Sequence, residues 1–143
     1  MATKIFVNLP VKNLGRSMQF FTELGFAFNP QFTSETSGCM VISESIFVML
    51  LEEDKFKMYA KKSLADTSVS SEVILALDAE SRSAVDDIVG KAVAAGGTMT
   101  DCKQDLGFMY IHGFADPDGH LWEVQWNPRL EITEDGYHFM RKG

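Results

Sequence analysis

The side chains of this sequence that could do chemistry are chiefly two carboxylates and one histidine. Glu72 begins one strand-like segment and Glu123 lies inside another, and carboxylate oxygens are ligands for hard divalent cations. Two carboxylates brought together would also raise the pKa of one of them and favour a shared proton or a bound cation. His112 shares its segment with Phe108 and Tyr110, where an imidazole could act as a base or a hydrogen-bond donor.

Each of these residues also has a structural interpretation. Glu123 needs no function if its face of the sheet is open to water, as one face of an antiparallel sheet often is. Glu72 would then be a solvated residue at the rim of a strand, and His112 a hydrogen-bonded structural residue. Cys39 and Cys102 are far apart without CxxC spacing, so we expect small buried hydrophobes rather than a zinc site or a disulfide.

The first part of the chain has the pattern of a strand, a helix and three further strands. Apolar residues alternate over residues 5–11, and Pro10 favours a strand at the sheet edge or an end there. Asn13 is typical of a helix N-cap, apolar residues then recur at helical spacing, and Gly25 suits the end of this helix. Three short strands are expected next, at residues 26–32, 38–42 and 46–51.

After a polar connector, residues 52–71 with a short helix near 56–61, the same order returns. Residues 72–77 alternate, and a helix then runs from about Ser83 to Gly96-Gly97. Strand-like segments follow at residues 98–100, 108–115 and 120–126. The sequence Asp-Pro-Asp-Gly at 116–119 predicts a tight turn, after which His120 is expected to face solvent.

One pattern therefore occurs twice, in residues 4–51 and 72–126. A single helix on a four-stranded sheet buries only one sheet face, so the other face needs the second half, a partner chain or a ligand. A ferredoxin-like sandwich fits less well, because three strand signals follow the first helix and a full second cycle comes after them.

The second face of these strands is expected to be apolar, rich in aromatic residues and to carry a few polar groups, as small-molecule sites do. Its predicted members are Phe6, Asn8, Glu72, Ile74, Phe108, Tyr110, His112, Leu121, Glu123 and Gln125. The sequence has no G-x-G-x-x-G loop, P-loop or G-x-S-x-G elbow, which argues against the common nucleotide-binding and serine-hydrolase functions.

The composition of the chain argues against two further classes of partner, nucleic acids and membranes. The chain of 143 residues has a formal net charge of −7, so its field repels a phosphate backbone and nucleic-acid binding is not expected. No apolar run approaches the roughly 20 residues of a membrane span, and no signal segment is recognisable at the start. We therefore expect a cytoplasmic protein without membrane contact.

Several motifs resemble the vicinal-oxygen-chelate superfamily of glyoxalase I, extradiol dioxygenases and bleomycin-resistance proteins. They are the segment 6–14 with Ser17 and Phe20-Phe21, Leu24-Gly25-Phe26, Gly96-Gly97, and the closing stretch 114–124 around the Asp-Pro-Asp-Gly turn. The likeness covers residues 4–127 and implies an α+β fold of two tandem βαβββ modules that form a cupped mixed sheet. The division that follows is one domain, with module one at 4–51, the connector at 52–71, module two at 72–127 and a tail at 128–143.

The resemblance also implies a ligand cup, frequent homodimers and, in many members, a divalent metal held by the first and last strands of each module. Carried over residue by residue, the metal positions of module two fall on Glu72 and Glu123. In module one they fall on Phe6, which cannot coordinate a metal, and on the strand 46–51, which has neither carboxylate nor histidine.

Two functional hypotheses follow for a glyoxalase-like homodimer that binds a small, aromatic or amphipathic molecule. The first is a lyase, isomerase or dioxygenase with a divalent metal on Glu72 and Glu123, with Glu123 and His112 as catalytic residues. The second is a metal-free resistance-type protein that sequesters its ligand. In both, Phe6, Asn8, Phe108, Tyr110 and Gln125 would contact the ligand. A third interpretation fills the cup with side chains and leaves only association with a partner.

Overall fold

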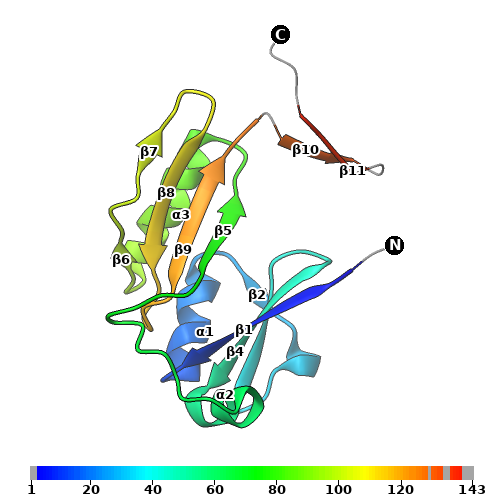
Figure 1. Cartoon of the computed structure of the whole chain (residues 1–143), viewed down its shortest axis with the longest axis vertical. Coiled ribbons are helices and arrows are strands. Elements are labelled where there is room, and N and C mark those ends of the chain that lie inside the picture. The colour runs from blue at the N-terminus through cyan, green and yellow to red at the C-terminus, as the bar shows by residue number, and fades with distance from the viewer. Residues whose placement is uncertain (1–2, 129, 134–135, 140–143) are drawn as a thin grey trace.

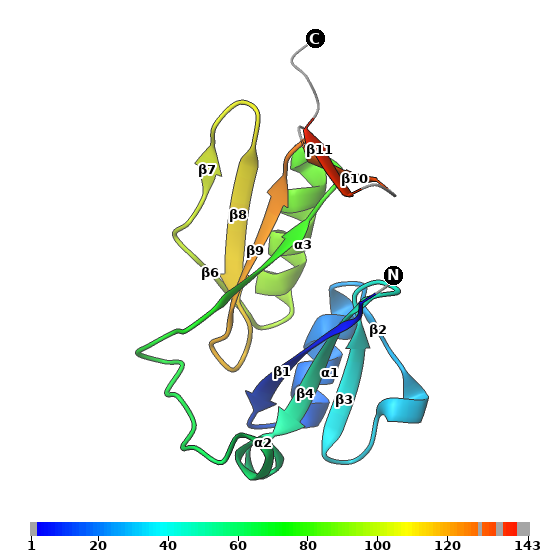
Figure 2. The same ribbon diagram turned by 45° about the vertical axis from the view of Figure 1, so that its right-hand side comes forward.

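The two modules form a four-stranded and a five-stranded sheet, each with a helix on one side (Figures 1 and 2). The computed structural model describes the backbone of residues 3–128, 130–133 and 136–139, and the side chains of residues 3–128. These are mixed sheets, as expected, with the strand–helix–strands order present twice.

Sheet one has the strand order β1-β4-β3-β2. Its strands are β1 (Ile5–Val11), β2 (Ala27–Phe28), β3 (Ser37–Val41) and β4 (Ile46–Glu52), and β1 runs parallel to β4 at the sheet edge. The strand expected at 26–32 is shorter than predicted. It stops because Asn29 accepts a hydrogen bond from the Gln31 N–H and begins a 3-10 helix, η1 (Pro30–Phe32).

Helix α1 (Leu14–Glu23) begins and ends where local sequence signals place it. The Asn13 side chain accepts a hydrogen bond from the Arg16 N–H at 3.0 Å, which satisfies a donor of the first turn. Gly25 has a φ of +106° after the last turn, a conformation that costs a glycine little. Phe20 and Phe21 lie on the buried side of this helix.

Sheet two has the order β5-β9-β8-β6, with the short β7 also paired to β8. Its strands are β5 (Ile74–Asp78), β6 (Thr98–Met99), β7 (Gln104–Asp105), β8 (Tyr110–Ala115) and β9 (Leu121–Trp126). Helix α3 (Arg82–Ala94) begins after its N-cap Ser81 and packs on β8 and β9. The expected strands 72–77 and 108–115 therefore start two residues later than predicted, which leaves Glu72 and Phe108 outside them.

The helix-facing sides of the two sheets share one core. Phe20 of α1 packs against Phe114 of sheet two with ring centroids 5.9 Å apart, and Phe21 packs against Trp122 at 5.2 Å. These aromatic contacts join the modules through α1, which lies beside α3 (Figure 2). The faces of the sheets turned away from the helices are called the open faces below.

The connector, residues 52–71, contains helix α2 (Glu53–Ala60), which begins earlier than the expected short helix. After α2 it runs along the outside of the molecule to β5 (Figure 1). After β9, the strands β10 (Leu130–Thr133) and β11 (Gly136–Phe139) pair in antiparallel orientation. Residues 129, 134–135 and 140–143 of the expected tail lie outside the described residues. None of the helices in the described part of the chain has the length and apolar character that a membrane crossing requires.

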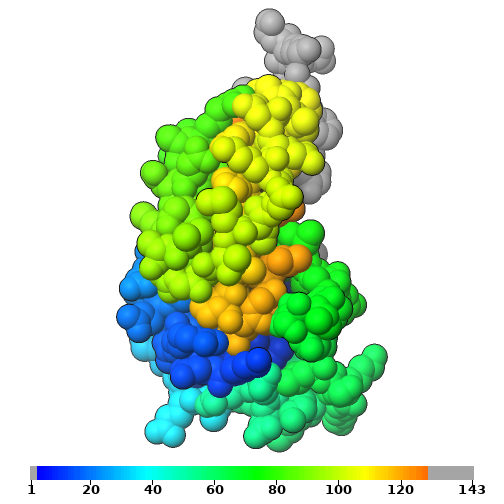
Figure 3. All heavy atoms as spheres, turned by 90° about the vertical axis from the view of Figure 1, so that its left-hand side faces the viewer, coloured from blue at the N-terminus to red at the C-terminus, as the bar shows by residue number. Residues whose placement is uncertain are grey.

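The turn between β8 and β9 fastens sheet two to the start of α1. Asp118 accepts hydrogen bonds from the Lys12 N–H at 2.8 Å and from the Ser17 hydroxyl at 2.9 Å, and Arg16 lies 3.6 Å from the same carboxylate. The Asp118 side chain is only 4% exposed, so these partners replace its hydration. In Figure 3 this orange turn lies directly on the blue residues of module one.

Hydrogen bonds within module two hold the same turn in shape, and the turn contacts module one at a second point. Buried Asp116 accepts hydrogen bonds from the N–H groups of Asp118 and His120 at 3.0 Å each and from the Trp122 indole at 3.1 Å. His120 contributes the second contact, because its Nε2 lies 2.7 Å from the Pro10 carbonyl oxygen. The expectation that His120 faces solvent is therefore wrong.

We predict that Asp118→Ala lowers the free energy of unfolding by about 2–3 kcal/mol, because it leaves the Ser17 hydroxyl and the Lys12 N–H without their acceptor. Urea denaturation followed by circular dichroism measures the change. Asp101→Ala is the matched control, since Asp101 is exposed, and should stay within about 0.5 kcal/mol of the parent. Equal stabilities for the two variants would contradict the role of this turn.

Candidate functional site

The open face of sheet one is an aromatic surface. Core residues Leu9, Val48 and Leu50 point toward the helices, so the residues that alternate with them lie on the open face. There Phe6 stacks on its strand neighbour Phe47 with ring centroids 4.8 Å apart and an interplanar angle of 10°. Phe6 remains 50% exposed, although exposure of a large aromatic ring is unfavourable in water.

A cavity of about 640 Å³ lies over this stacked pair. Its lining, beside the two rings, consists of Lys4, Asn8, Asn29, Phe32, Cys39 and Met49. This volume falls within the range of small-molecule sites, roughly 300–1,000 Å³. The described cavity contains no residue of module two, so module one alone forms it.

The polar groups of this cavity lie around the stacked rings of Phe6 and Phe47. The Lys4 ammonium stands 5.4 Å from the Phe47 ring centroid and donates to the Glu44 carbonyl oxygen at 3.0 Å. The Asn8 side chain donates to the Phe6 carbonyl oxygen at 3.1 Å, which fixes the amide beside the ring. Cys39 is an unpaired thiol whose pKa is raised by burial, so its thiol form is favoured, as its sequence context suggested.

The open face of sheet two is less apolar and holds Glu123 and Gln125. Glu123 lies between Ala76 of β5 and Gly113 of β8, and Gln125 between Asp78 and Ile111. Ala76 is exposed, but the space over Gly113 is filled, because a Cβ there would stand 2.7 Å from the Cys102 Sγ and 2.8 Å from the Thr100 Oγ1. Glu123 is partly exposed, and both of its sequence interpretations remain compatible with this position.

Tyr110 and His112 do not share this face with Glu123, so their predicted place on the second face is wrong. Their β9 neighbours are Trp126 and Val124, which point toward α3, and both side chains are buried there. The Tyr110 hydroxyl donates to Asp86 at 2.6 Å, and this hydrogen bond, followed by burial, raises the pKa of Tyr110.

His112 has the environment of a structural residue. Its Nδ1 accepts a hydrogen bond from the Gly113 N–H at 2.9 Å, which requires that nitrogen to be unprotonated. Burial, followed by the positive charge of Lys103, lowers the pKa of His112, while Asp86 acts in the opposite direction. Because the neutral imidazole is favoured and lies under α3, the structure does not bring His112 together with Glu123.

Arg82 packs on the helix-facing side of sheet two. Its guanidinium lies over the Trp126 ring at 5.1 Å and the Tyr110 ring at 5.5 Å, and it forms an ion pair with Asp105. It also donates to the Gly107 carbonyl oxygen at 2.9 Å, next to Phe108. Phe108 itself precedes β8 and is 40% exposed, away from the cavity on sheet one.

Glu72 is not at the first-strand position assigned to it. Asn13 is the N-cap of α1 and Ser81 is the N-cap of α3. Phe6 precedes Asn13 by the same number of residues as Ile74 precedes Ser81. The register agrees, because Phe6 pairs with Phe47 and Ile74 with Leu121 at corresponding places of the two sheets. Ile74 is therefore the counterpart of Phe6, and Glu72 lies before the strand.

The same comparison identifies Met49 as the counterpart of Glu123, since they pair with Asn8 and Ala76 respectively. The four family-type metal positions thus hold Phe6, Met49, Ile74 and Glu123, of which only Glu123 offers an oxygen ligand. Among the described residues, no group of three or more histidine, cysteine or acidic side chains is placed to hold a metal ion. The residues present do not fit a divalent metal centre at these positions.

Sequence analysis identified Phe6 and Asn8 of the cavity but missed Phe47, Met49 and Cys39. The run 46–51 is apolar on both faces, so it contains no alternation that could separate open-face residues from core residues. The signal that could have found them is the parallel pairing of the first and last strands of a βαβββ module, which places Phe47 beside Phe6.

Comparison with known proteins identifies the fold. A family model described as "Bleomycin resistance protein-like N-terminal" matches residues 3–43, and no curated protein matches the chain. The structure of a glyoxalase-related enzyme from Fulvimarina pelagi is similar with a TM-score of 0.79 and 22% identity, over 99% of this chain and 100% of that one. The chain has the glyoxalase/bleomycin-resistance/dioxygenase fold.

Two further structures agree with this fold. A hypothetical protein, SA1046 from S. aureus, has a TM-score of 0.75 and 28% identity, over 88% of this chain and 94% of that chain. The fosfomycin resistance protein FosX from Listeria monocytogenes has a TM-score of 0.67 and 18% identity, over 89% of this chain and 94% of that chain. The expected resemblance to the vicinal-oxygen-chelate superfamily and its paired βαβββ modules is thus confirmed.

Proposed function

We propose that this glyoxalase-fold protein binds a small planar aromatic molecule on the open face of sheet one without using a metal ion. The observation that carries the proposal is the exposed Phe6–Phe47 stack at the floor of a cavity of about 640 Å³. A flat ring laid on such a pair gains both apolar burial and favourable ring contacts. Sequestration of a ligand needs no chemistry beyond this surface.

The polar groups favour an aromatic ligand with an anionic substituent. Lys4 supplies the positive charge beside the Phe47 ring, and the Asn8 and Asn29 amides supply hydrogen-bonding groups. An anion at the rim leaves the ring free to cover Phe6 and Phe47.

The enzymatic alternative rests on Glu123. Its carboxylate is partly exposed between Ala76 and Gly113 and could serve as a base toward a ligand that reaches sheet two. The remaining proposed catalytic and metal residues lie elsewhere, His112 beneath α3 and Glu72 before β5. Binding therefore has more structural support than a lyase, isomerase or dioxygenase reaction.

We predict that 2-naphthoate binds the protein more tightly than cyclohexanecarboxylate, because only the flat ring can stack on Phe6 and Phe47. Phe6→Ala and Phe47→Ala should each weaken 2-naphthoate binding about tenfold, the equivalent of one lost aromatic contact. Isothermal titration calorimetry measures both effects.

Tyr59→Ala is the matched control, since Tyr59 is an exposed aromatic residue outside this cavity. It should bind 2-naphthoate as the parent does. Unchanged binding in the Phe6→Ala, Phe47→Ala double variant, or no preference for the flat ring, would contradict the proposed function.

We also propose that two copies of the chain associate so that the open face of sheet two covers that of sheet one in the partner. Large apolar side chains are exposed on both, with Phe6 50% and Ile74 54% exposed. In addition, β1 and β5 are the outermost strands of their sheets, and unpaired edges favour association. Such a homodimer would bring Glu123 and Gln125 of one chain toward the aromatic cavity of the other.

Ile74→Glu should convert this dimer into a monomer, because it places a charge on the apolar edge that the partner would bury. Size-exclusion chromatography with light scattering gives the mass directly. The control Val69→Glu replaces an apolar residue of the connector that is 80% exposed and should leave the mass unchanged. A parent protein of monomer mass, or a dimeric Ile74→Glu, would contradict this arrangement.

A further inference from the structure

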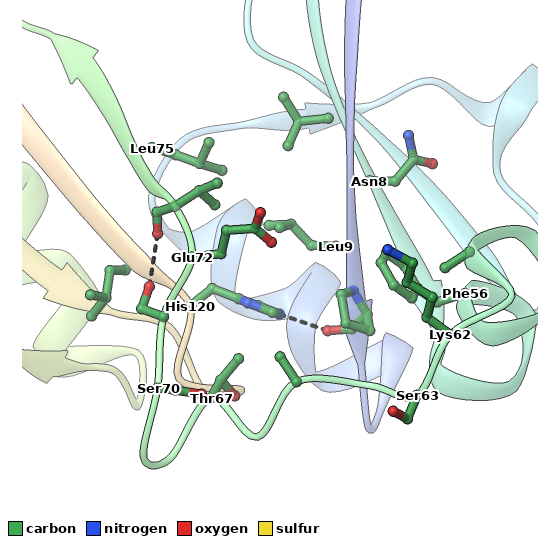
Figure 4. Close-up of a pocket in the computed structure, with 17 residues that line it drawn as sticks. Asn8, Leu9, Phe56, Lys62, Ser63, Thr67, Ser70, Glu72, Leu75 and His120 are labelled. Carbon is green, nitrogen blue, oxygen red and sulfur yellow. Dashed lines mark hydrogen bonds between the residues drawn. The ribbon is translucent and has the colours of Figure 1, made fainter.

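A second cavity lies between the modules, away from the stacked phenylalanines. It has a volume of about 390 Å³ and is bounded by β1, by the start of β5 and by α2 with the connector (Figure 4). Apolar side chains provide most of its wall, among them Val7, Leu9, Phe56, Leu75 and Leu121. Asn8 lines both cavities from the edge strand, but neither Phe6 nor Phe47 reaches this one.

The Glu72 carboxylate points into this cavity between Leu9 and His120 (Figure 4). Within the described residues, no hydrogen-bond donor or cationic side chain is paired with it. The two other polar groups nearby are engaged or peripheral, because His120 contacts the Pro10 carbonyl oxygen at 2.7 Å and Lys62 lies beside Phe56. Glu72 is an exposed residue, so water hydrates its charge in the free protein and a ligand in the cavity can reach it.

We propose that the inter-module cavity is a binding site for a small amphipathic amine. The protonated amine would pair with Glu72, and its hydrocarbon part would lie against Leu9, Leu75 and Leu121. The volume suits a chain of about six carbons, since such sites enclose most of a small ligand's surface. The overall negative charge of the protein favours the approach of a cation.

Glu72 was expected to be a metal ligand but lies before the strand that holds that position. In this proposal it binds the ammonium group of the ligand instead. The site is independent of the proposed aromatic cavity, so either one can fail without the other.

The test is a titration of the full-length protein at pH 7 with hexylamine, hexanoate and hexanol, followed by ¹⁵N NMR. Hexylamine is expected to shift the backbone amides of Val73, Leu75 and Leu121 but not those of Phe47 and Met49. It should bind at least about fivefold more tightly than hexanoate, because Glu72 attracts one head group and repels the other. Shifts confined to sheet one, or a preference for hexanoate, would overturn the proposal.

Substitutions at Glu72 identify the charge responsible. Glu72→Gln should weaken hexylamine binding at least about fivefold and abolish the preference over hexanol, whereas Glu72→Lys should reverse the preference toward hexanoate. Glu80→Gln, which removes an exposed carboxylate outside the cavity, is the matched control and should bind as the parent does. Equal hexylamine affinity in Glu72→Gln and Glu80→Gln would refute the assignment.

Discussion

The contact between the β8–β9 turn and the first turn of α1 is the constraint on which the rest of the structure depends. Asp118 accepts from a backbone and a side-chain donor of module one, and Asp116 holds the turn in the shape that allows this. With the turn fixed there, Phe20 and Phe21 of α1 pack on sheet two, and both sheets turn their helix sides inward. The open face of each sheet then lies on the side away from α1 and α3.

This arrangement accounts for the character of the candidate site. An uncovered sheet face would normally be polar, yet sheet one presents the stacked Phe6 and Phe47, and the edge strand of sheet two presents Ile74. The resemblance implies oxygen and nitrogen ligands at four positions of a metal centre. Three of these positions hold apolar residues, and only Glu123 has an oxygen ligand. The open faces are therefore better suited to hold a flat apolar molecule and a second chain than a divalent ion.

Much of the fold could be predicted because its signals are local. Asn13 and Gly25 mark the ends of α1, the alternation of residues 5–11 fixes the faces of β1, and the Asp-Pro-Asp-Gly turn is where the sequence places it. The face of β8 could not be predicted, because Tyr110 and Ile111 are both acceptable core residues and only the register with β9 decides between them. His120 and Pro10 are far apart in the sequence, so no local sequence pattern indicates their contact.

The central claim is that this member of the fold binds its ligand without a metal ion, because three of four family-type ligand positions are Phe6, Met49 and Ile74. Elemental analysis tests it most directly, on protein incubated with zinc, manganese or nickel ions and then freed of unbound metal, beside Glu123→Gln. The account predicts far less than one bound ion per chain in both proteins. One ion per chain in the parent, lost in Glu123→Gln, would contradict it.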